Sequence, residues 1–226
     1  MKLGVLLPTF APDATRALEH AARAAQEGID GVFAYDHLWP MGTPTRPALA
    51  PLPVLAAVAA AHPSLAVGPL VARVGLGSVD HLVKGLRTLH ALAPGRVIAG
   101  LGTGDKLSAA ENEAYGLGYP SANERRADLA QAIVALRDEM PVWVGGGSEA
   151  THELAFSLGA TLNLWNRTPE QIAQAAVRGP VNWAGPRPDD LPATLSALRD
   201  AGATWAIVTP DVEIAELVSW RTGAGG

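Results

Sequence analysis

A regular alternation between two kinds of segment most constrains what this chain can fold into. Short apolar runs of strand length alternate with longer amphipathic stretches of helical period along the 226 residues. The expected strands are Lys2–Pro8, Gly31–Tyr35, Leu65–Val71, Arg96–Leu101, Pro141–Val144, Thr161–Leu164, Val181–Ala184 and Trp205–Thr209. This alternation predicts a parallel sheet with helical crossovers, and eight such units close most naturally into a compact (β/α)8 TIM barrel with few insertions.

Local signals at the segment ends support the expected helices. Gly28 stands just past a helix C-terminus, Ser121 and Glu124 form a capping box, and Thr168 precedes a proline at a first helical position. The expected helices cover residues 13–27, 47–61, 78–92, 121–139, 148–158, 190–201 and 212–220, with one further helix that starts at Thr168. The alternative is a doubly wound open sheet. That fold usually has a glycine-rich phosphate turn after its first strand, and residues 8–12 contain no glycine.

Composition narrows the class of protein further. A hydrophobic content of 48% with 17% charged residues is typical of a globular protein, and we expect a single barrel domain over residues 1–226. The net charge of −5 offers no basic face for nucleic acid. The apolar opening segment is halted by Pro8 and is too short for a signal peptide, and no run is long enough to span a membrane. Together with the absence of cysteine, this predicts a cytoplasmic protein.

Two glycine-rich loops are expected at the same end of the barrel, where the loops after the strands build the active site. Gly102, Thr103 and Gly104 follow the fourth expected strand, and the loop 145–148 follows the fifth and opens a helix. Backbone N–H groups in adjacent glycine loops, together with a helix N-terminus, can hold phosphate. Each loop taken alone is also accounted for by a tight turn.

Polar and aromatic side chains follow other strands at this end. Asp36 and His37 come after the second strand, and the pair can be either a surface hydrogen bond or a catalytic pair. Trp39 and Trp165 can stack on a flat ring or serve as plain core or rim residues. The other histidines lie within or at the ends of helical stretches without metal-ligand spacing, so no metal site is expected.

Three segments together resemble the luciferase-like monooxygenase superfamily. They are Asp-His at 36–37, Gly-Arg-Val-x-x-Gly-Leu-Gly-Thr-Gly-Asp at 95–105, and Val-Gly-Gly-Gly-Ser at 144–148. The segment 104–116, Gly-Asp-Lys-Leu-Ser-Ala-Ala-Glu-Asn-Glu-Ala-Tyr-Gly, is similar to members that use the deazaflavin coenzyme F-420. The resemblance runs along nearly the whole chain. It implies an oxidoreductase that transfers hydride between coenzyme F-420 and a small organic substrate.

The resemblance also implies roles for particular residues. The catalytic histidine of the family falls on His37 and its acidic residue on Asp105, and Asp36 is expected to orient the histidine. Asp105 can alternatively cap a short helix that starts near Ser108. The expected cofactor contacts are Gly68, Pro69, Gly102, Thr103, Gly104, Gly146, Gly147 and Ser148, with Trp39 and Trp165 as candidates for ring stacking.

Two further expectations concern the cofactor. Members of the family have a cis peptide at the end of the third strand, and that position matches Gly68–Pro69, which predicts a cis bond there. An ordinary trans proline is the alternative. Arg125 or Arg126 can reach an acidic cofactor tail, or the two can simply lie on a helix surface.

Three functions remain open at this point. The first is a coenzyme F-420-dependent oxidoreductase in which His37 moves the substrate proton. The second is an FMN-dependent monooxygenase or reductase of the same superfamily, and the third is a barrel that binds flavin without catalysis. We also expect a possible homodimer through the apolar stretch Leu49–Ala61, which can equally pack against its own barrel.

Overall fold

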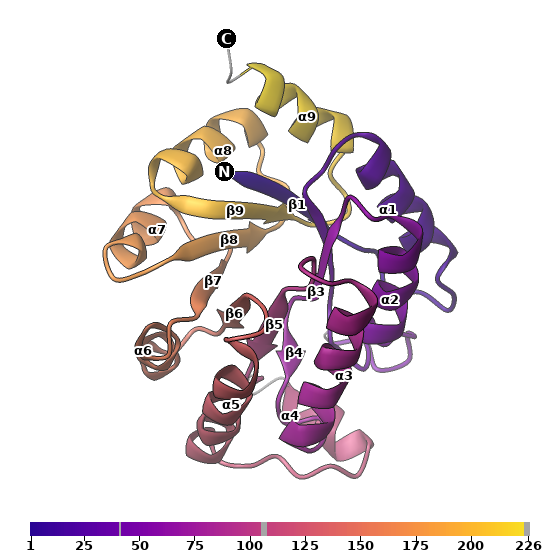
Figure 1. Ribbon diagram of the computed structural model, residues 1–226, viewed down its shortest axis with the longest axis vertical. Helices are drawn as coiled ribbons and strands as arrows, with labels where there is room; N and C mark the ends of the chain where they lie inside the picture. Colours follow the sequence, from indigo (N-terminus) through magenta and orange to yellow (C-terminus); the bar gives the residue numbers. More distant parts are fainter. Residues whose placement is uncertain (41, 105–107, 224–226) are drawn as a thin grey trace.

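The computed structural model describes residues 1–40, 42–104 and 108–223. These residues form a nine-stranded parallel sheet that curves into a nearly closed barrel with helices outside it (Figure 1). The strands are β1 (Lys2–Leu6), β2 (Gly31–Ala34), β3 (Ala66–Pro69), β4 (Ala72–Arg73), β5 (Ala99–Gly102), β6 (Val142–Gly145), β7 (Thr161–Trp165), β8 (Val181–Gly185) and β9 (Ala203–Val208). Their order is β3-β2-β1-β9-β8-β7-β6-β5-β4, which confirms the predicted (β/α)8 barrel.

The third predicted strand, Leu65–Val71, ends early as β3, and β4 begins only beyond its predicted end. The break between β3 and β4 lies where the two edges of the sheet meet. β3 pairs with β2, whereas β4 pairs with β5. Val67 also forms a parallel bridge with Val97, just before β5. β3 and β4, which follow one another in the chain, therefore bring the first and last edges of the sheet together.

The cis peptide was predicted at Gly68–Pro69, and that prediction is wrong. Among the described residues, the cis bond joins Leu70 and Val71. Gly68 and Pro69 are still paired in register with Phe33 and Ala34 of β2, so regular strand geometry continues through Pro69. The chain leaves the strand only after that proline, and the break falls there.

The helices lie close to their predicted positions. They are α1 (Thr15–Gln26), α2 (Pro51–Ala61), α3 (Val79–Leu92), α4 (Ser108–Ala114), α5 (Ala122–Leu136), α6 (Glu149–Ser157), α7 (Pro169–Ala176), α8 (Leu191–Asp200) and α9 (Ile214–Gly223). Ser121 with Glu124 and Thr168 with Gln171 form the expected capping boxes. α2 buries Val54, Leu55 and Val58, so much of its apolar surface is used within the chain.

Aromatic side chains fill the barrel interior. Phe33 stacks on Trp143 with ring centroids 5.1 Å apart, and Trp143 meets Trp205 edge to face at 5.4 Å. Leu6, Leu70, Ile98, Ala184 and Ile207 are the other buried members of this inner cluster. A separate apolar layer lies between the sheet and the helices. The barrel interior is therefore filled by packed side chains at this level.

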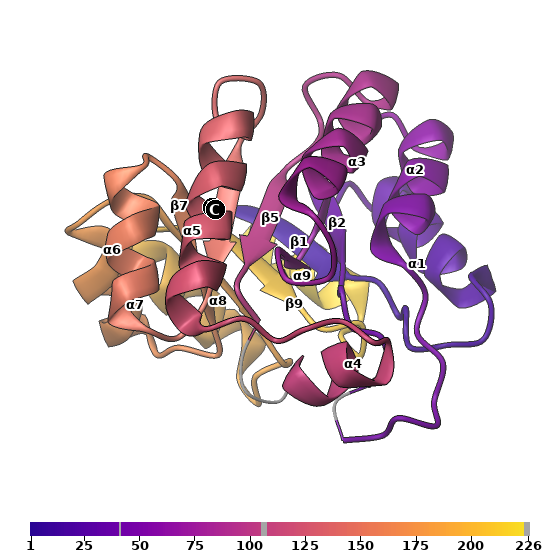
Figure 2. The same ribbon diagram turned by 90° about the horizontal axis from the view of Figure 1, so that it is seen from below.

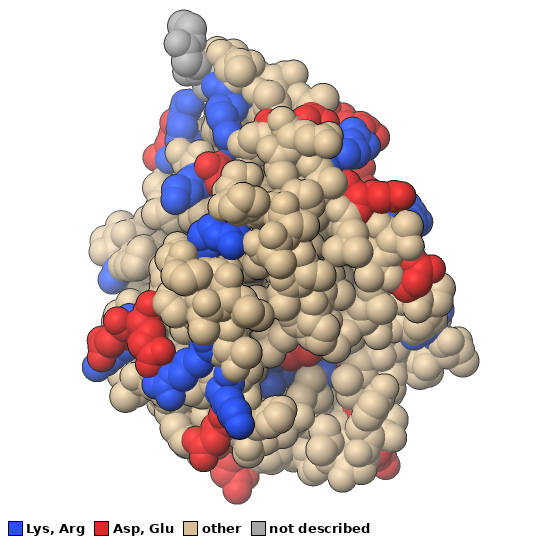
Figure 3. Space-filling model, turned by 45° about the vertical axis from the view of Figure 1, so that its right-hand side comes forward, with Lys and Arg blue, Asp and Glu red and all other residues tan. Residues whose placement is uncertain are grey.

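The outer surface shows no single dominant charge on the face drawn in Figure 3. Basic and acidic side chains lie near one another around its margin, and uncharged residues occupy its middle. In the described part of the chain, no helix has the length and apolar character that crossing a bilayer requires.

Candidate active site

A cavity of about 760 Å³ lies at the carboxyl ends of the strands. Its size falls in the range of small-molecule and cofactor sites, and barrel enzymes place their active sites at this end. Figure 2 shows α4 on the same side of the barrel as the loop after β2. The cavity is lined by residues 10, 35, 37, 70, 71, 73, 102–104, 108, 122, 125, 126, 145–148, 151, 163–165 and 167.

Many of the predicted site residues meet in this one cavity. They are His37, Gly102, Thr103, Gly104, Gly146, Gly147, Ser148 and Trp165. Asp36, Trp39, Gly68 and Pro69 are not among the residues that line it. Asp105 lies outside the residues that the structure describes. The convergence of the imidazole and both glycine loops is therefore observed, whereas the functional roles of these residues stay predictions.

His37 is held by a carboxylate that the sequence prediction did not assign. Its Nδ1 lies 2.8 Å from Oε1 of Glu111, a buried residue of α4. Because a carboxylate only accepts hydrogen bonds, this contact places a proton on Nδ1. The neutral ring then has its lone pair on Nε2, which is the atom that can accept a proton.

Glu111 also contacts two other donors. Its Oε2 accepts hydrogen bonds from the backbone N–H of Leu38 and from Nη2 of Arg73, each at 2.8 Å. Arg73 is 6% exposed, and Nε of its guanidinium donates to the backbone carbonyl of Asp36 at 3.1 Å. One carboxylate therefore ties the loop after β2 to the end of β4.

Asp36 has a different role from the one expected. Its Oδ2 accepts a hydrogen bond from the backbone N–H of Arg73 at 2.9 Å, and the carboxylate that contacts the His37 ring is that of Glu111. The side chain of Asp36 turns toward β4 because an unpaired backbone donor is available there. Burial raises the pKa of the Asp36 carboxyl above its ordinary value of 3.8, although the hydrogen bond and the charge of Arg73 oppose this shift.

The raised pKa of Asp36 predicts a pH dependence of stability. The folded protein binds this proton more tightly than the unfolded chain, so the contribution of Asp36 to the free energy of unfolding falls as the pH rises from 3.8 through the raised pKa. We expect Asp36→Asn to keep the bond to Arg73 N and to remove that part of the slope. Urea denaturation of both proteins between pH 4 and 8 measures the difference. If the free energy of unfolding depends on pH in the same way in both proteins, the expectation is contradicted.

One end of the cavity combines backbone and side-chain features that favour an anion. Ser148 accepts a hydrogen bond from the backbone N–H of Thr151 and begins α6, so free N–H groups and the positive end of the helix dipole lie beside Gly146 and Gly147. Gly104 has φ +68°, a left-handed conformation that favours glycine. Arg125 reaches this end from α5, and its buried Nε has no hydrogen-bond partner among the described residues.

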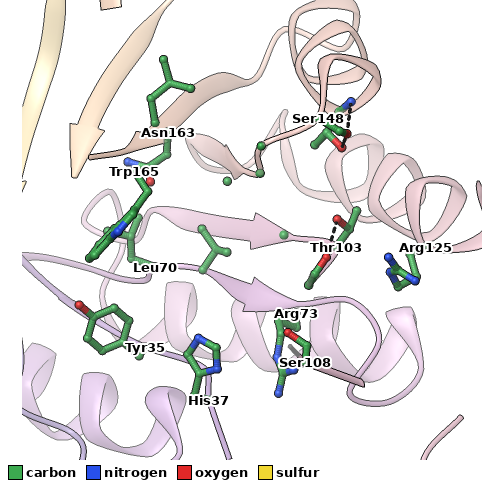
Figure 4. A pocket seen from close by; sticks show the side chains of 18 of the residues that line it. Tyr35, His37, Leu70, Arg73, Thr103, Ser108, Arg125, Ser148, Asn163 and Trp165 are labelled. Carbon is green, nitrogen blue, oxygen red and sulfur yellow. Dashed lines mark hydrogen bonds between the residues drawn. The ribbon is translucent and has the colours of Figure 1, made fainter. Parts of the chain in front are cut away.

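The other end is apolar and aromatic. Phe10 stacks on Tyr35 with ring centroids 5.2 Å apart, and Tyr35 meets Trp165 edge to face at 6.1 Å. Leu70 and Val71, which are joined by the cis bond, also line the cavity, and Figure 4 shows Leu70 near Tyr35 and Trp165. Figure 4 shows Tyr35 and Trp165 at one end and Thr103, Ser148 and Arg125 at the other.

Trp39 lies outside this aromatic end. Its ring stacks on Tyr115, just past α4, with centroids 6.4 Å apart. The stack joins the loop after β2 to the segment after α4, as Glu111 does from the buried side. The residue expected to stack on the cofactor ring is therefore engaged with the protein itself.

Arg73 and Glu111 are the site residues that the sequence prediction missed. The sequence held only a weak signal for Glu111: the spacing i, i+3 and i+4 puts Ser108, Glu111 and Asn112 on one face of a short helix, and the structure shows that this face is buried. Polar residues on the inward face of a helix indicate a built hydrogen-bond network. For Arg73 no local pattern separates it from a surface arginine.

The fold and the cavity define the class of protein, a (β/α)8 barrel with a large cavity, apolar at one end and polar at the other, at the carboxyl ends of its strands. The family model for luciferase-like monooxygenases matches residues 1–138, and the chain belongs to this family. The resemblance stated from the sequence is thereby confirmed.

Similar proteins are named for one cofactor. An F420-dependent glucose-6-phosphate dehydrogenase of Beutenbergia cavernae is 35% identical over 129 residues, which are 57% of this chain and 37% of that protein. The enzyme of the same name from Intrasporangium calvum is 33% identical over 121 residues, 53% of this chain and 36% of that protein. The aligned segments thus span little more than a third of the length of these relatives.

Solved structures share the fold at low sequence identity. An F420-dependent secondary alcohol dehydrogenase in complex with an F420-acetone adduct has a TM-score of 0.80 at 14% identity, covering 98% of this chain and 97% of that one. The coenzyme F420-dependent tetrahydromethanopterin reductase of Methanopyrus kandleri has a TM-score of 0.73 at 12% identity, covering 97% and 96%. At these identities the likeness establishes the fold alone.

Proposed function

We propose that this protein is an oxidoreductase that uses coenzyme F-420 to transfer hydride to or from a small organic substrate. The observation that carries the proposal is one cavity that combines an aromatic end, an end with two glycine loops and a helix N-terminus, and a histidine whose Nδ1 is held by Glu111. The names of the relatives support the same cofactor. In this proposal residues 1–226 act as one barrel domain.

The residues of the cavity fit such a cofactor. A Cβ on Gly147 would meet no atom within 4 Å, so the backbone there faces open space in which a phosphate can approach. Gly146, Gly147, Ser148, Thr103 and Gly104 would hold the phosphate, and Arg125 would pair with the acidic tail. The flat ring would lie toward Leu70, Val71 and Trp165.

The deazaflavin would supply a carbon that exchanges hydride and reacts poorly with oxygen. The protein then has to orient the substrate and to move one proton. Nε2 of His37 would take the hydroxyl proton of an alcohol, or return it in the opposite direction, while Glu111 holds the ring. Asp105 remains a candidate for a second proton-transfer group.

A binding titration tests the cofactor before any substrate is known. We expect the protein to quench the fluorescence of coenzyme F-420 with a dissociation constant in the low micromolar range or below, on the order of 8 kcal/mol of binding free energy. FMN is expected to bind at least about tenfold more weakly. The opposite order would replace the proposal by the FMN-dependent alternative.

The anion-binding end makes a separate prediction. Gly147→Ala is expected to fold normally, because its Cβ meets nothing in the protein, and to weaken binding of coenzyme F-420 by about tenfold, because that Cβ enters the space assigned to the phosphate. The matched control is Gly118→Ala, where a Cβ also meets no atom within 4 Å and which lies outside the cavity. Fluorescence titration and thermal melting of both variants give the result. Equal affinities would contradict the assigned position of the phosphate.

A further inference from the structure

Arg73 has one donor that the described protein leaves unused. Its side chain is 5% exposed and lines the cavity. Nη2 donates to Glu111 and Nε to the carbonyl of Asp36, but the buried Nη1 has no hydrogen-bond partner among the described residues. A buried donor without a partner is costly, so such an atom at a cavity wall indicates an acceptor on the ligand.

The position of Arg73 relative to His37 is fixed by a shared partner. One oxygen of Glu111 holds Nδ1 of His37 and the other holds Nη2 of Arg73, both at 2.8 Å. The guanidinium of Arg73 and the imidazole of His37 therefore donate to the two oxygens of one carboxylate. Figure 4 shows Tyr35, His37 and Arg73 along one side of the cavity, opposite Asn163 and Ser148.

The charges around Arg73 indicate what kind of acceptor it meets. Its positive charge is already paired with Glu111, and the carboxyl of Asp36 lies on its backbone side. A second carboxylate or a phosphate at Nη1 would add negative charge to this group. An uncharged hydroxyl or carbonyl oxygen would accept the hydrogen bond without the electrostatic repulsion that a further negative charge would cause.

We propose that Nη1 of Arg73 donates a hydrogen bond to the substrate oxygen that exchanges its proton with His37. The inference rests on the proposed function and assigns the substrate to the alcohols and the corresponding carbonyl compounds. In the oxidation, the O–H proton passes to Nε2 of His37, the C–H hydride passes to the deazaflavin, and the C=O bond forms. Arg73 stabilises the negative charge that develops on this oxygen as the proton leaves.

The test uses a small alcohol that resists oxidation. 2,2,2-Trifluoroethanol is titrated into the protein loaded with oxidised coenzyme F-420, and its binding is followed by ¹⁹F NMR. We expect Arg73→Met to weaken trifluoroethanol binding about tenfold or more and Arg73→Lys to weaken it less, while the affinity for coenzyme F-420 stays within twofold. The control is Arg87→Met, which removes an exposed arginine paired with Glu139 on the outer helices.

Each other outcome overturns the inference. Unchanged trifluoroethanol binding in Arg73→Met, or no binding to the loaded wild-type protein, shows that Nη1 does not hold an alcohol oxygen. Loss of coenzyme F-420 binding in both Arg73 variants shows that the donor serves the cofactor. If the wild-type protein does not bind coenzyme F-420, the proposed function fails. Trifluoroethanol binding to the wild-type protein and to the Arg73 variants can then still be compared with FMN-loaded and with cofactor-free protein. Arg73→Lys keeps the charge beside Glu111, so one variant remains testable if Arg73→Met does not fold.

Discussion

Replacing Glu111 by glutamine is expected to lower the free energy of unfolding by about 3–5 kcal/mol. The carboxylate accepts hydrogen bonds from His37, Leu38 and Arg73, and only 1% of Glu111 is exposed. An amide has one acceptor oxygen and presents an NH2 group to donors, so it cannot satisfy all three. It also leaves the buried charge of Arg73 without its partner. Urea denaturation with a constant m-value measures the change.

The control for Glu111 lies on the same helix. Glu113→Gln changes an exposed carboxylate of α4 and is expected to stay within about 0.5 kcal/mol of the wild-type protein. If Glu111→Gln lies equally close to the wild-type value, the network of three donors does not hold α4 against the barrel, and the positioning of His37 needs another cause.

Replacing His37 by asparagine is expected to lower the turnover number by about 10²–10⁴-fold, measured with a substrate that the wild-type protein turns over. The dissociation constant of coenzyme F-420 is expected to change little, because the cofactor contacts lie mainly on the two glycine loops. Asparagine can still donate a hydrogen bond to Glu111 but cannot accept and return a proton at neutral pH. Stopped-flow reduction of the bound cofactor separates the hydride step from product release.

Two comparisons make the His37 result decisive. His81→Asn changes an exposed histidine of α3 outside the cavity and should leave turnover unchanged. If His37→Asn turns over normally, another group carries the proton. If no variant and no substrate gives turnover while cofactor still binds, the barrel that binds without catalysis becomes the better account.

The fold could be predicted because each of its elements is specified locally. Strand runs such as Gly31–Ala34 and capping residues such as Ser121 and Thr168 act over a few residues, and the barrel follows from their alternation. The break between β3 and β4 could not be predicted with the same accuracy. It depends on where the edges of the sheet meet, which is a property of the closed barrel and not of the residues 66–73 alone.

The parts of the candidate site that are formed by backbone could be predicted from the sequence. The parts that depend on contacts between side chains were harder to predict. The loops at 102–104 and 146–148 were predicted because two glycine loops at the same end of a barrel, one of them opening a helix, can hold phosphate, and both line the cavity. The partner of His37 was sought next to it in sequence, at Asp36. The structure places Glu111 there instead, 74 residues away, because a buried backbone donor on Arg73 engages Asp36. Pairings over such separations follow from packing and leave little trace in local pattern.

The shortness of α4 has a consequence for how substrate preference can change in this protein. A helix of seven residues is unstable in isolation, so α4 exists because Glu111 and its neighbours dock it on the barrel. The strand pairing of the barrel, by contrast, does not involve any residue of α4. Exchanging Ser108, the α4 residue that lines the cavity, while keeping Glu111 would therefore change the cavity wall with the scaffold intact, which makes this segment a natural starting point for altering selectivity.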